Sequence, residues 1–377
     1  MYLDDIELEN APLITSAEVT EKKEVTKKQK APRLTEMSSG GGCGCKVDPA
    51  SLSEMLADVQ QTSVPKDLLV GIEHSDDAAV YKINEEQAIV VTNDFFTSIV
   101  DDPYLFGKIA AANSLSDVYA MGGTPTMATA IAGFPVNELS MSDRQEIMRG
   151  GVEVCQEAGI PLAGGHTIDN PQPIFGLAVV GLVHPNQIKK NANAKVGDVL
   201  ILTKPLGIGI MASAFKLNVI SSTGYKEFVK NITLLNKPGA WLGKQLGVNA
   251  MTDITGFGLA GHLVEMAKDT NVRFDIDTTN VPIIEDALTH VVEGIVPSGA
   301  YRNMSSYGHE LNFSEQWDSD HQLIFSDPQT NGGLLVSVEP NYAEHYVSEL
   351  NKMGYDDVRI IGRVEPSDKN QALVSFL

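Results

Sequence analysis

From Ser51 onward, short apolar runs that fit strands are interspersed with longer runs that fit helices, and this mixture limits the possible folds most. The β-branched runs 87–96 and 174–183 predict strands, and so does the run 321–328. The runs 103–123 and 140–159, which end in glycine, predict helices. Strands and helices follow no strict βα repeat. The order therefore favours an α+β fold over a doubly wound sheet.

The polar run 184–198 contains proline and glycine, and it places a junction near residues 185–196 between two halves of similar length. The first 39 residues lack a sustained apolar period and carry mixed charges, which indicates a flexible arm, disordered or weakly helical. The expected organisation is an arm (1–39), a glycine-rich Cys/Lys segment with a lead-in helix (40–62), an N-terminal α+β domain (63–185) and a C-terminal α+β domain (196–377).

Composition excludes several classes of protein. A formal charge of −21 argues against nucleic acid as a partner, because phosphate backbones select basic surfaces. No apolar run reaches the roughly 20 residues that a membrane span needs, and the acidic N-terminus is unlike a signal peptide. Three cysteines cannot form a disulfide framework in 377 residues. We therefore expect a cytoplasmic protein with no membrane partner.

Two of the three cysteines lie in the glycine segment, Gly40–Lys46, with the sequence GGGCGCK. A Cys-x-Cys pair could be part of a zinc or copper site, but zinc needs about four ligands. The sequence offers no second cysteine pair and no histidine cluster beside the first. Tightly held zinc in the purified protein would favour the metal-site interpretation.

Aspartates at strand ends and inside apolar segments carry the strongest chemical signal. Asp117 lies in an apolar helix with Asn113 one turn before it, so both side chains leave the same face. Any single aspartate could be a turn former or a cap. As a group in one cleft, they offer the oxygen ligands that a hard cation shares with phosphate. The group comprises Asp76, Asp77, Asp94, Asp117, Asp169 and Asp253.

Three glycine-containing segments, 163–169, 203–211 and 327–335, fit neither a Walker A motif nor a dinucleotide-binding pattern. We interpret them as turns, with the first following a helix and preceding a strand. Glycine allows backbone N–H groups to approach phosphate oxygens. Together with the aspartates, these segments predict that phosphate and metal are held without a P-loop.

The sequence resembles the selenophosphate synthetase (selenide, water dikinase) family over about residues 40–377. The Cys-Gly-Cys-Lys entry is specific to this family, whereas the other motifs also occur in the wider aminoimidazole ribonucleotide synthetase-like superfamily of ATP-using enzymes. The matching stretches are GGCGCK, LLVGIEHSDDAAVY, NDFFTSIVDDPYLFGKIAAANSLSDVYAMGG, LAGGHTIDNPQPIFGLAVVG, LTKPLGIGI, AMTDITGFGLAGHL and SDPQTNGGLL.

The resemblance implies two α+β domains, of which the N-terminal one (63–185) binds ATP and metal. It also implies that the N-terminal domains pair into a β-barrel across a homodimer. It implies conversion of ATP, selenide and water into selenophosphate, AMP and phosphate, which supplies activated selenium for selenocysteine and selenium-modified tRNA. Magnesium is the implied cofactor, with a monovalent cation such as K⁺ and a selenium-delivery protein as further candidates.

The resemblance also assigns site residues. Cys43 would be the active-site residue and Lys46 would be essential beside it. The implied magnesium ligands are Asp77, Asp117 and Asp253. The implied nucleotide-site residues are Lys46, His74, Ser75, Asp76, Asp94, Asp117, Gly165, His166 and Thr167.

Selenide is ionised at neutral pH and needs delivery rather than a general base, so a soft thiolate on a mobile segment suits it. We expect Lys46 to lower the pKa of Cys43, and the glycine segment to close over the nucleotide as a lid. Cys45 could handle selenium, form a disulfide under oxidation, or serve only as a small residue. Rival functions are an ATP-dependent kinase or synthetase for an organic substrate, such as thiamine phosphate or a formylglycinamidine, and a catalytically silent paralogue.

Overall fold

The computed structural model of the chain describes residues 32–38, 40–47, 51, 54–55, 64–71, 76–368 and 371–377, without the side chain of Cys45. Residues 1–31 and 39 of the expected arm, most of the lead-in helix, His74 and Ser75 lie outside these residues, whereas 32–38 of the arm are described. Within the described part, no helix is both long enough and apolar enough to span a membrane.

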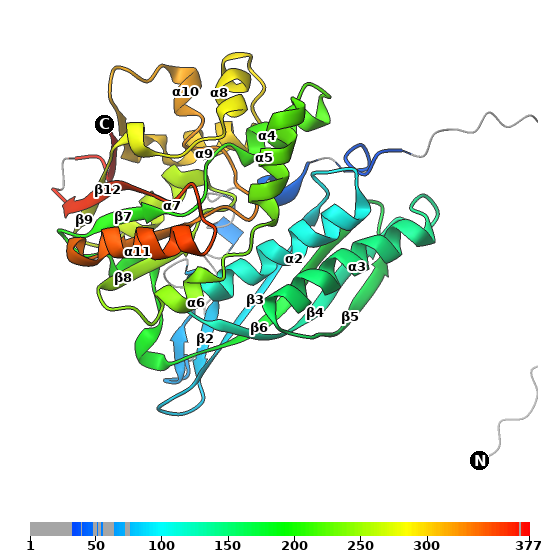
Figure 1. Cartoon of the computed structure of the whole chain (residues 1–377), viewed down its shortest axis with the longest axis horizontal. Helices are drawn as coiled ribbons and strands as arrows, with labels where there is room; N and C mark the ends of the chain where they lie inside the picture. Colours follow the sequence, from blue (N-terminus) through cyan, green and yellow to red (C-terminus); the bar gives the residue numbers. More distant parts are fainter. Residues whose placement is uncertain are drawn as a thin grey trace, which may run out of the picture. The chain divides into compact units, whose positions relative to one another are not determined.

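The first half of the described chain forms a six-stranded sheet in the order β1-β2-β3-β6-β4-β5, in which only β4 and β5 are parallel neighbours. Two helices, α2 (Pro103–Ala120) and α3 (Met141–Ala158), lie side by side across one face of this sheet (Figure 1). The strands are β1 (Leu68–Val70), β2 (Ala79–Lys82), β3 (Ala88–Thr97), β4 (Thr124–Phe134), β5 (Leu162–Asp169) and β6 (Ile174–Val183).

Helix α2 is buried around nearly its whole circumference, because apolar and small residues occupy all its sides. Asp102 caps its N-terminus by accepting a hydrogen bond from the N–H of Leu105 at 2.9 Å. Glycines let it approach α3 closely: a side chain at Gly107 or Gly150 would collide with the backbone of the facing helix. The close packing fixes the helix that carries Asp117.

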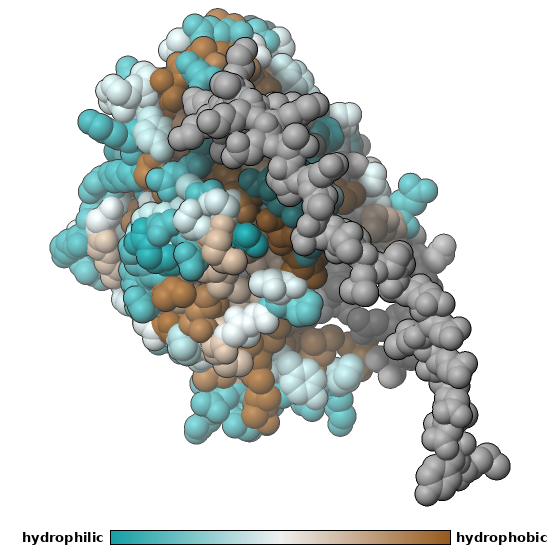
Figure 2. All heavy atoms as spheres, turned by 90° about the vertical axis from the view of Figure 1, so that its right-hand side faces the viewer, coloured by the Kyte–Doolittle hydropathy of each residue, from teal (hydrophilic) through white to brown (hydrophobic). Residues whose placement is uncertain are grey.

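The opposite face of this sheet leaves large apolar side chains exposed. Paired residues of neighbouring strands point to the same face of a sheet, and side chains alternate along each strand. Tyr81 and Leu182 both pair with Ile89, and Met127 pairs with Val180, two residues before Leu182, so these side chains share one face. Seen from the side on which β5 lies in Figure 1, hydrophobic residues reach the surface among hydrophilic ones (Figure 2). We name the set the open face: Tyr81, Val91, Phe95, Met127, Ile168 and Leu182.

The second half forms a mixed seven-stranded sheet in the order β10-β13-β9-β12-β7-β11-β8 within the described residues. Its strands are β7 (Val199–Leu202), β8 (Val248–Asp253), β9 (Val272–Ile276), β10 (Leu311–Phe313), β11 (Leu334–Val338), β12 (Arg359–Pro366) and β13 (Val374–Phe376). Its helices are α4 (Ile208–Lys216), α5 (Ser222–Thr233), α6 (Pro238–Leu242), α7 (Gly258–Ala267), α8 (Glu285–Val292), α9 (Ser298–Tyr307), α10 (Ser319–Gln322) and α11 (Pro340–Lys352).

Two expectations about local structure are wrong. The run 321–328, predicted as a strand, contains the end of α10 and turns, because Asp318 caps the N–H groups of Asp320 and His321. The run 163–169, predicted as a glycine turn, belongs to β5, where Gly165 lies so close to Ala130 of β4 that a side chain would not fit. Pairing with a distant strand, rather than local turn propensity, decides this segment.

Candidate active site

Helix α2 and strand β3 bring the first carboxylates together. Asp94 accepts a hydrogen bond from Nδ2 of Asn113 at 2.5 Å, and Asp117 accepts one from Oγ1 of Thr92 at 2.5 Å. Asn113 and Asp117 are one helical turn apart and both turn toward β3, as their spacing predicts. The Asp117 side chain is buried, with only 9% of its surface exposed.

Strand β8 of the second half adds another carboxylate at its end. Asp253 is 1% exposed and accepts a hydrogen bond from Oγ of Ser116, on α2, at 2.5 Å. Its neighbour Thr252 donates to Asp77 at 2.8 Å, which draws the segment before β2 to the same place. We call Asp77, Asp94, Asp117 and Asp253 the carboxylate cluster; it lies where the two halves of the molecule meet.

Burial and mutual repulsion make these carboxylates reluctant to ionise. Burial is the largest cause that raises the pKa of Asp77 and Asp117, followed by the charges of neighbouring aspartates. Burial likewise raises the pKa of Asp253 to about 6, against the hydrogen bond from Ser116 and the charge of Lys46. A positive ion in the cluster would relieve this repulsion.

The donor set fits a hard cation. Asp77 keeps a buried Oδ2 that no described residue contacts by a hydrogen bond, and all the candidate ligand atoms are oxygens. Within the described residues, however, no three His, Cys, Asp or Glu side chains are already arranged to hold a metal ion. Phosphate oxygens of a nucleotide would have to complete the coordination.

The glycine segment brings Cys43 to this cluster. A short helical turn, η1 (Gly42–Cys45), places Cys43 with 2% of its surface exposed. Its N–H donates to Oγ1 of Thr330 at 3.0 Å, and its thiol donates to Oδ1 of Asn113 at 3.2 Å. Asn113 thus links Cys43 directly to Asp94.

The expectation that Cys43 has a lowered pKa is wrong for this conformation. Lys46 does lower it, but burial and the charge of Asp94 outweigh that effect and raise the pKa of the thiol. The pKa of the Lys46 ammonium is raised, chiefly by Asp94. Lys46 itself remains exposed, with its stem beside Gly256. In this conformation burial favours the protonated thiol of Cys43, and the ammonium of Lys46 is exposed to an incoming anion.

A cavity of about 210 Å³ opens beside these residues, lined by Cys43, Lys46, Asp94, the end of β3 and Ile174. Small-molecule sites in proteins usually measure about 300–1,000 Å³. A nucleotide would therefore have to displace part of the lining, and the glycine segment is the part of it that belongs to no sheet or long helix.

Family models match both halves of the chain. Residues 75–183 match "AIR synthase related protein, N-terminal domain", and residues 195–375 match "AIR synthase related protein, C-terminal domain". A selenide, water dikinase from Pseudomonas straminea is 49% identical over 338 residues, which cover 89% of this chain and 94% of that protein. Another, from Burkholderia ambifaria (strain MC40-6), is 47% identical over 88% of this chain and 94% of its own length. The chain belongs to the selenide, water dikinase family. The resemblance inferred from the motifs is confirmed.

Solved structures with low sequence identity share the fold. The thiamine monophosphate kinase from Aquifex aeolicus has a TM-score of 0.61 at 15% identity, covering 87% of this chain and 96% of that chain. The hydrogenase maturation protein HypE of E. coli has a TM-score of 0.59 at 19% identity, covering 81% and 88%. The α+β, aminoimidazole ribonucleotide synthetase-like fold predicted for this selenide, water dikinase family member is therefore confirmed.

Of the other predicted nucleotide-site residues that the structure describes, Asp76 adjoins Asp77 of the carboxylate cluster, whereas the three on β5 lie away from it. Asp76 accepts a hydrogen bond from the N–H of Asn191, in the 3₁₀ turn η3 (Asn191–Asn193) between the two halves. Gly165, His166 and Thr167 lie on β5, an edge strand with β6 and β4 between it and β3. In one chain of this selenide, water dikinase family member, these three residues do not share a site with Asp94.

Some residues of the site escaped sequence reasoning. Ser116 and Thr330 hold Asp253 and Cys43, respectively, although both lie in stretches already singled out by their motifs. Lys204 is 2% exposed and donates to the carbonyls of Leu234 and Asn331 at 2.6 and 2.8 Å. Burial lowers the pKa of Lys204 to about 7 against the opposing effect of Asp253. A lysine after an apolar strand was the available signal, but its burial could not be read from the sequence.

Proposed function

We propose that this chain converts ATP, selenide and water into selenophosphate, AMP and phosphate. Membership of the selenide, water dikinase family supports this activity. The observation that carries it is the meeting of Cys43 with the carboxylate cluster through Asn113. A soft sulfur beside a set of hard oxygens suits a reaction that joins a selenium nucleophile to a phosphoryl group.

The described residues divide this work. Asp77, Asp117 and Asp253 would hold magnesium, which when bound neutralises charge on the phosphate chain. Lys46 would bind the phosphate oxygens, because it is the exposed cation of the glycine segment. Cys43 would hold selenide, and closure of η1 would keep water away from the first transfer. Water would then take the β-phosphate of the remaining ADP, leaving AMP.

Phosphorus NMR of an anaerobic reaction with ATP, magnesium and selenide tests the activity. Selenophosphate, phosphate and AMP should appear together, and AMP formation should depend on selenide. Formation of ADP as the only nucleotide product would contradict the proposal and favour a simple kinase. Potassium in place of sodium in the same assay tests for a monovalent-cation requirement.

We further propose that the working form is a homodimer that pairs two open faces. Exposed apolar side chains there include Phe95 at 52% and Ile168 at 50% of their surfaces, and burying them against a second copy is favourable. The edge strand β5 borders this face. A second copy could therefore bring Gly165, His166 and Thr167 to a nucleotide site that one chain leaves without them.

Replacing Leu182 by glutamate should dissociate the dimer, because a charge on the open face would be buried without a partner. Analytical ultracentrifugation should show a dimer for the wild type and a monomer for Leu182→Glu. Leu246→Glu, at a position 72% exposed in the second half, is the control and should remain a dimer. A monomeric wild-type protein at micromolar concentration would contradict the proposed assembly.

The proposed reaction also sets conditions on the surroundings of the protein. Both Cys43 and Cys155 are free and buried, and a selenide-handling thiol must stay reduced. We propose that the protein acts in the cytoplasm. Selenide is toxic and readily oxidised, so delivery by a partner protein would be advantageous; a pull-down under anaerobic conditions tests for one.

A further inference from the structure

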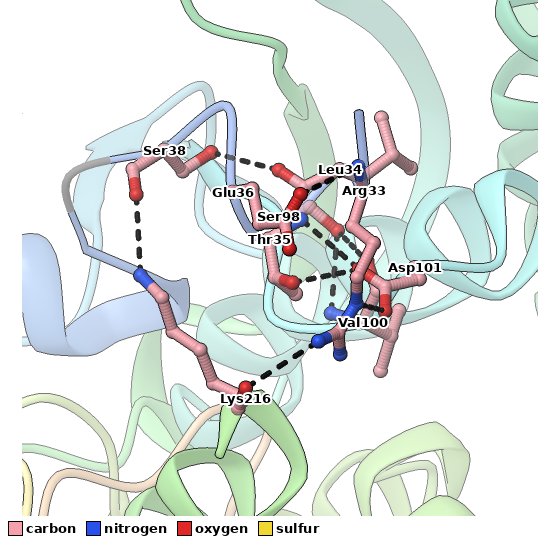
Figure 3. A network of polar contacts seen from close by, with 9 residues as sticks. All are labelled: Arg33, Leu34, Thr35, Glu36, Ser38, Ser98, Val100, Asp101 and Lys216. Carbon is pink, nitrogen blue, oxygen red and sulfur yellow. Dashed lines mark hydrogen bonds and ion pairs between the residues drawn. The ribbon is translucent and has the colours of Figure 1, made fainter. Parts of the chain in front are cut away.

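The chain enters the glycine segment through a strap, Arg33–Ser38, that is attached to both halves of the molecule (Figure 3). Leu34, Thr35 and Ser38 are buried, with 4%, 2% and 4% of their surfaces exposed. The strap lies only a few residues before Cys43. Its attachment therefore limits where the catalytic thiol and lysine can go.

Asp101 receives three hydrogen bonds from the strap. Its Oδ2 accepts from Nε of Arg33 at 2.5 Å, and its Oδ1 accepts from both the N–H and the hydroxyl of Thr35, at 3.1 and 2.7 Å. Figure 3 shows these donors converging on the one carboxylate. Hydrogen bonds to a charged acceptor are stronger than those between neutral groups.

Helix α4 holds the other side of the strap. The guanidinium of Arg33 lies 5.6 Å from the centre of the Phe215 ring and donates to the carbonyl of Lys216 at 3.5 Å. Lys216 in turn donates from Nζ to the carbonyl of Ser38 at 3.3 Å. The strap thus bridges the loop after β3, in the first half, and α4, in the second.

From the strap, the chain follows the loop after β3 to the catalytic residues. The carbonyl of Gly40 accepts a hydrogen bond from Thr97 at 2.9 Å, and Gly41 packs against Ser98 and Ile99. Thr330 then holds the N–H of Cys43. Strap, loop and Cys43 form one continuous line of contacts along the strand that carries Asp94.

The fold itself does not depend on Asp101 to start α2. Asp102 caps that helix, and Ser98 stabilises the loop by bonding the carbonyl and the N–H of Val100 at 2.5 and 3.3 Å. The side chain of Asp101 is only part-buried, at 27% exposed. The hydrogen bonds of Asp101 therefore hold the strap and are not needed to start α2.

We propose that Asp101 is a positioning residue for the reaction: by holding the strap, it keeps Cys43 and Lys46 at the carboxylate cluster. Asp101 does not itself contact the reacting groups. The inference rests on the function proposed for Cys43 and Lys46, but the position of the thiol can be measured without turnover.

Alkylation by iodoacetamide, followed by peptide mass spectrometry, tests the proposal on the nucleotide-free protein. In Asp101→Asn, Cys43, distinguished from Cys45 by fragmentation of their shared peptide, should be modified about tenfold faster than in the wild type, because opening of the segment exposes the thiol more often. In steady-state assays the kcat should fall about 10- to 100-fold through misplacement of Cys43 and Lys46, and the KM for ATP should rise with it, because Lys46 binds the phosphate oxygens.

Three further variants separate positioning from general stability. Thr35→Ser keeps the hydroxyl donor and should behave as the wild type, whereas Thr35→Val loses it and should speed Cys43 alkylation. Asp356→Asn removes an exposed ion pair with Lys230 and should leave the alkylation rates of Cys43 and Cys155 unchanged. Unchanged Cys43 alkylation in Asp101→Asn would overturn the proposal, as would equally accelerated modification of the buried Cys155. A wild-type protein that makes no AMP would instead refute the proposed function.

Discussion

Asp253→Asn should lose selenide-dependent AMP formation while gaining stability in the absence of metal. The carboxylate holds the cation, and the cation neutralises charge on the phosphates. Loss of the carboxylate therefore costs several kcal/mol of transition-state stabilisation, or roughly 10²- to 10⁴-fold in rate. The amide keeps the size of the side chain and can still accept the hydrogen bond from Ser116. The activity should therefore disappear without loss of the fold.

The gain in stability should depend on pH with a definite sign. The pKa of Asp253 is raised to about 6 in the folded chain, above its value of about 4 when unfolded. The folded state then holds the proton more tightly, so the wild-type protein loses stability as pH rises from about 4 through about 6. Asp253→Asn lacks that loss, and its advantage in free energy of unfolding should grow over this range, on the order of 1–3 kcal/mol.

Urea unfolding at pH 4.5 and 7.5 in EDTA, with the AMP assay alongside, measures both effects. Asp198→Asn is a suitable control, because Asp198 is also buried but is surrounded by donors from Asn249 and Ser337. This control should lose stability and keep the capacity to form AMP. An Asp253→Asn protein that is less stable than the wild type at pH 7.5 would contradict the repulsion inferred for the carboxylate cluster.

Cys43→Ser should reduce selenophosphate formation to below about one thousandth of the wild-type rate, within the range seen on removal of single catalytic side chains. Serine is nearly the same size and can donate to Asn113 as the thiol does. The loss would then report on the affinity of sulfur for selenium rather than on packing. Binding of ATP, measured by calorimetry, should be nearly unchanged.

Cys155→Ala is the matched control for the thiol. Cys155 is fully buried on α3, where burial raises its pKa to about 11, and it contributes only packing. The variant should keep full activity. Retention of wild-type selenophosphate formation by Cys43→Ser would refute the role given to Cys43.

The sequence predicts those site residues whose local context is unusual. Asp117 stands out because a charged side chain in a helix that is apolar on all sides needs a partner, and the structure places Thr92 beside it. Asp253 stands out in the same way at the end of an apolar strand. The α+β class likewise follows from the mixture of strand-like and helix-like hydrophobic runs, because each run can be recognised from its own residues.

Contacts between distant parts of the chain were not predictable in this way. Thr330 accepts a hydrogen bond from Cys43, which lies 287 positions away in the sequence, and no local pattern predicts that contact. Gly165 joins β5 because β4 lies close to it in space, whereas the glycines alone indicated a turn. The pKa of Cys43 also depends on burial by distant residues, so the nearby Lys46 suggested the wrong direction.

The burial of Cys43 as a protonated thiol should slow its oxidation when the protein is exposed to air. Peroxide attacks the thiolate form of cysteine, and attack requires access. A chain that covers this sulfur and keeps its proton between turnovers should form sulfenic acid slowly. The glycine segment should thereby make the resting protein more tolerant of oxidants than the selenide that it binds.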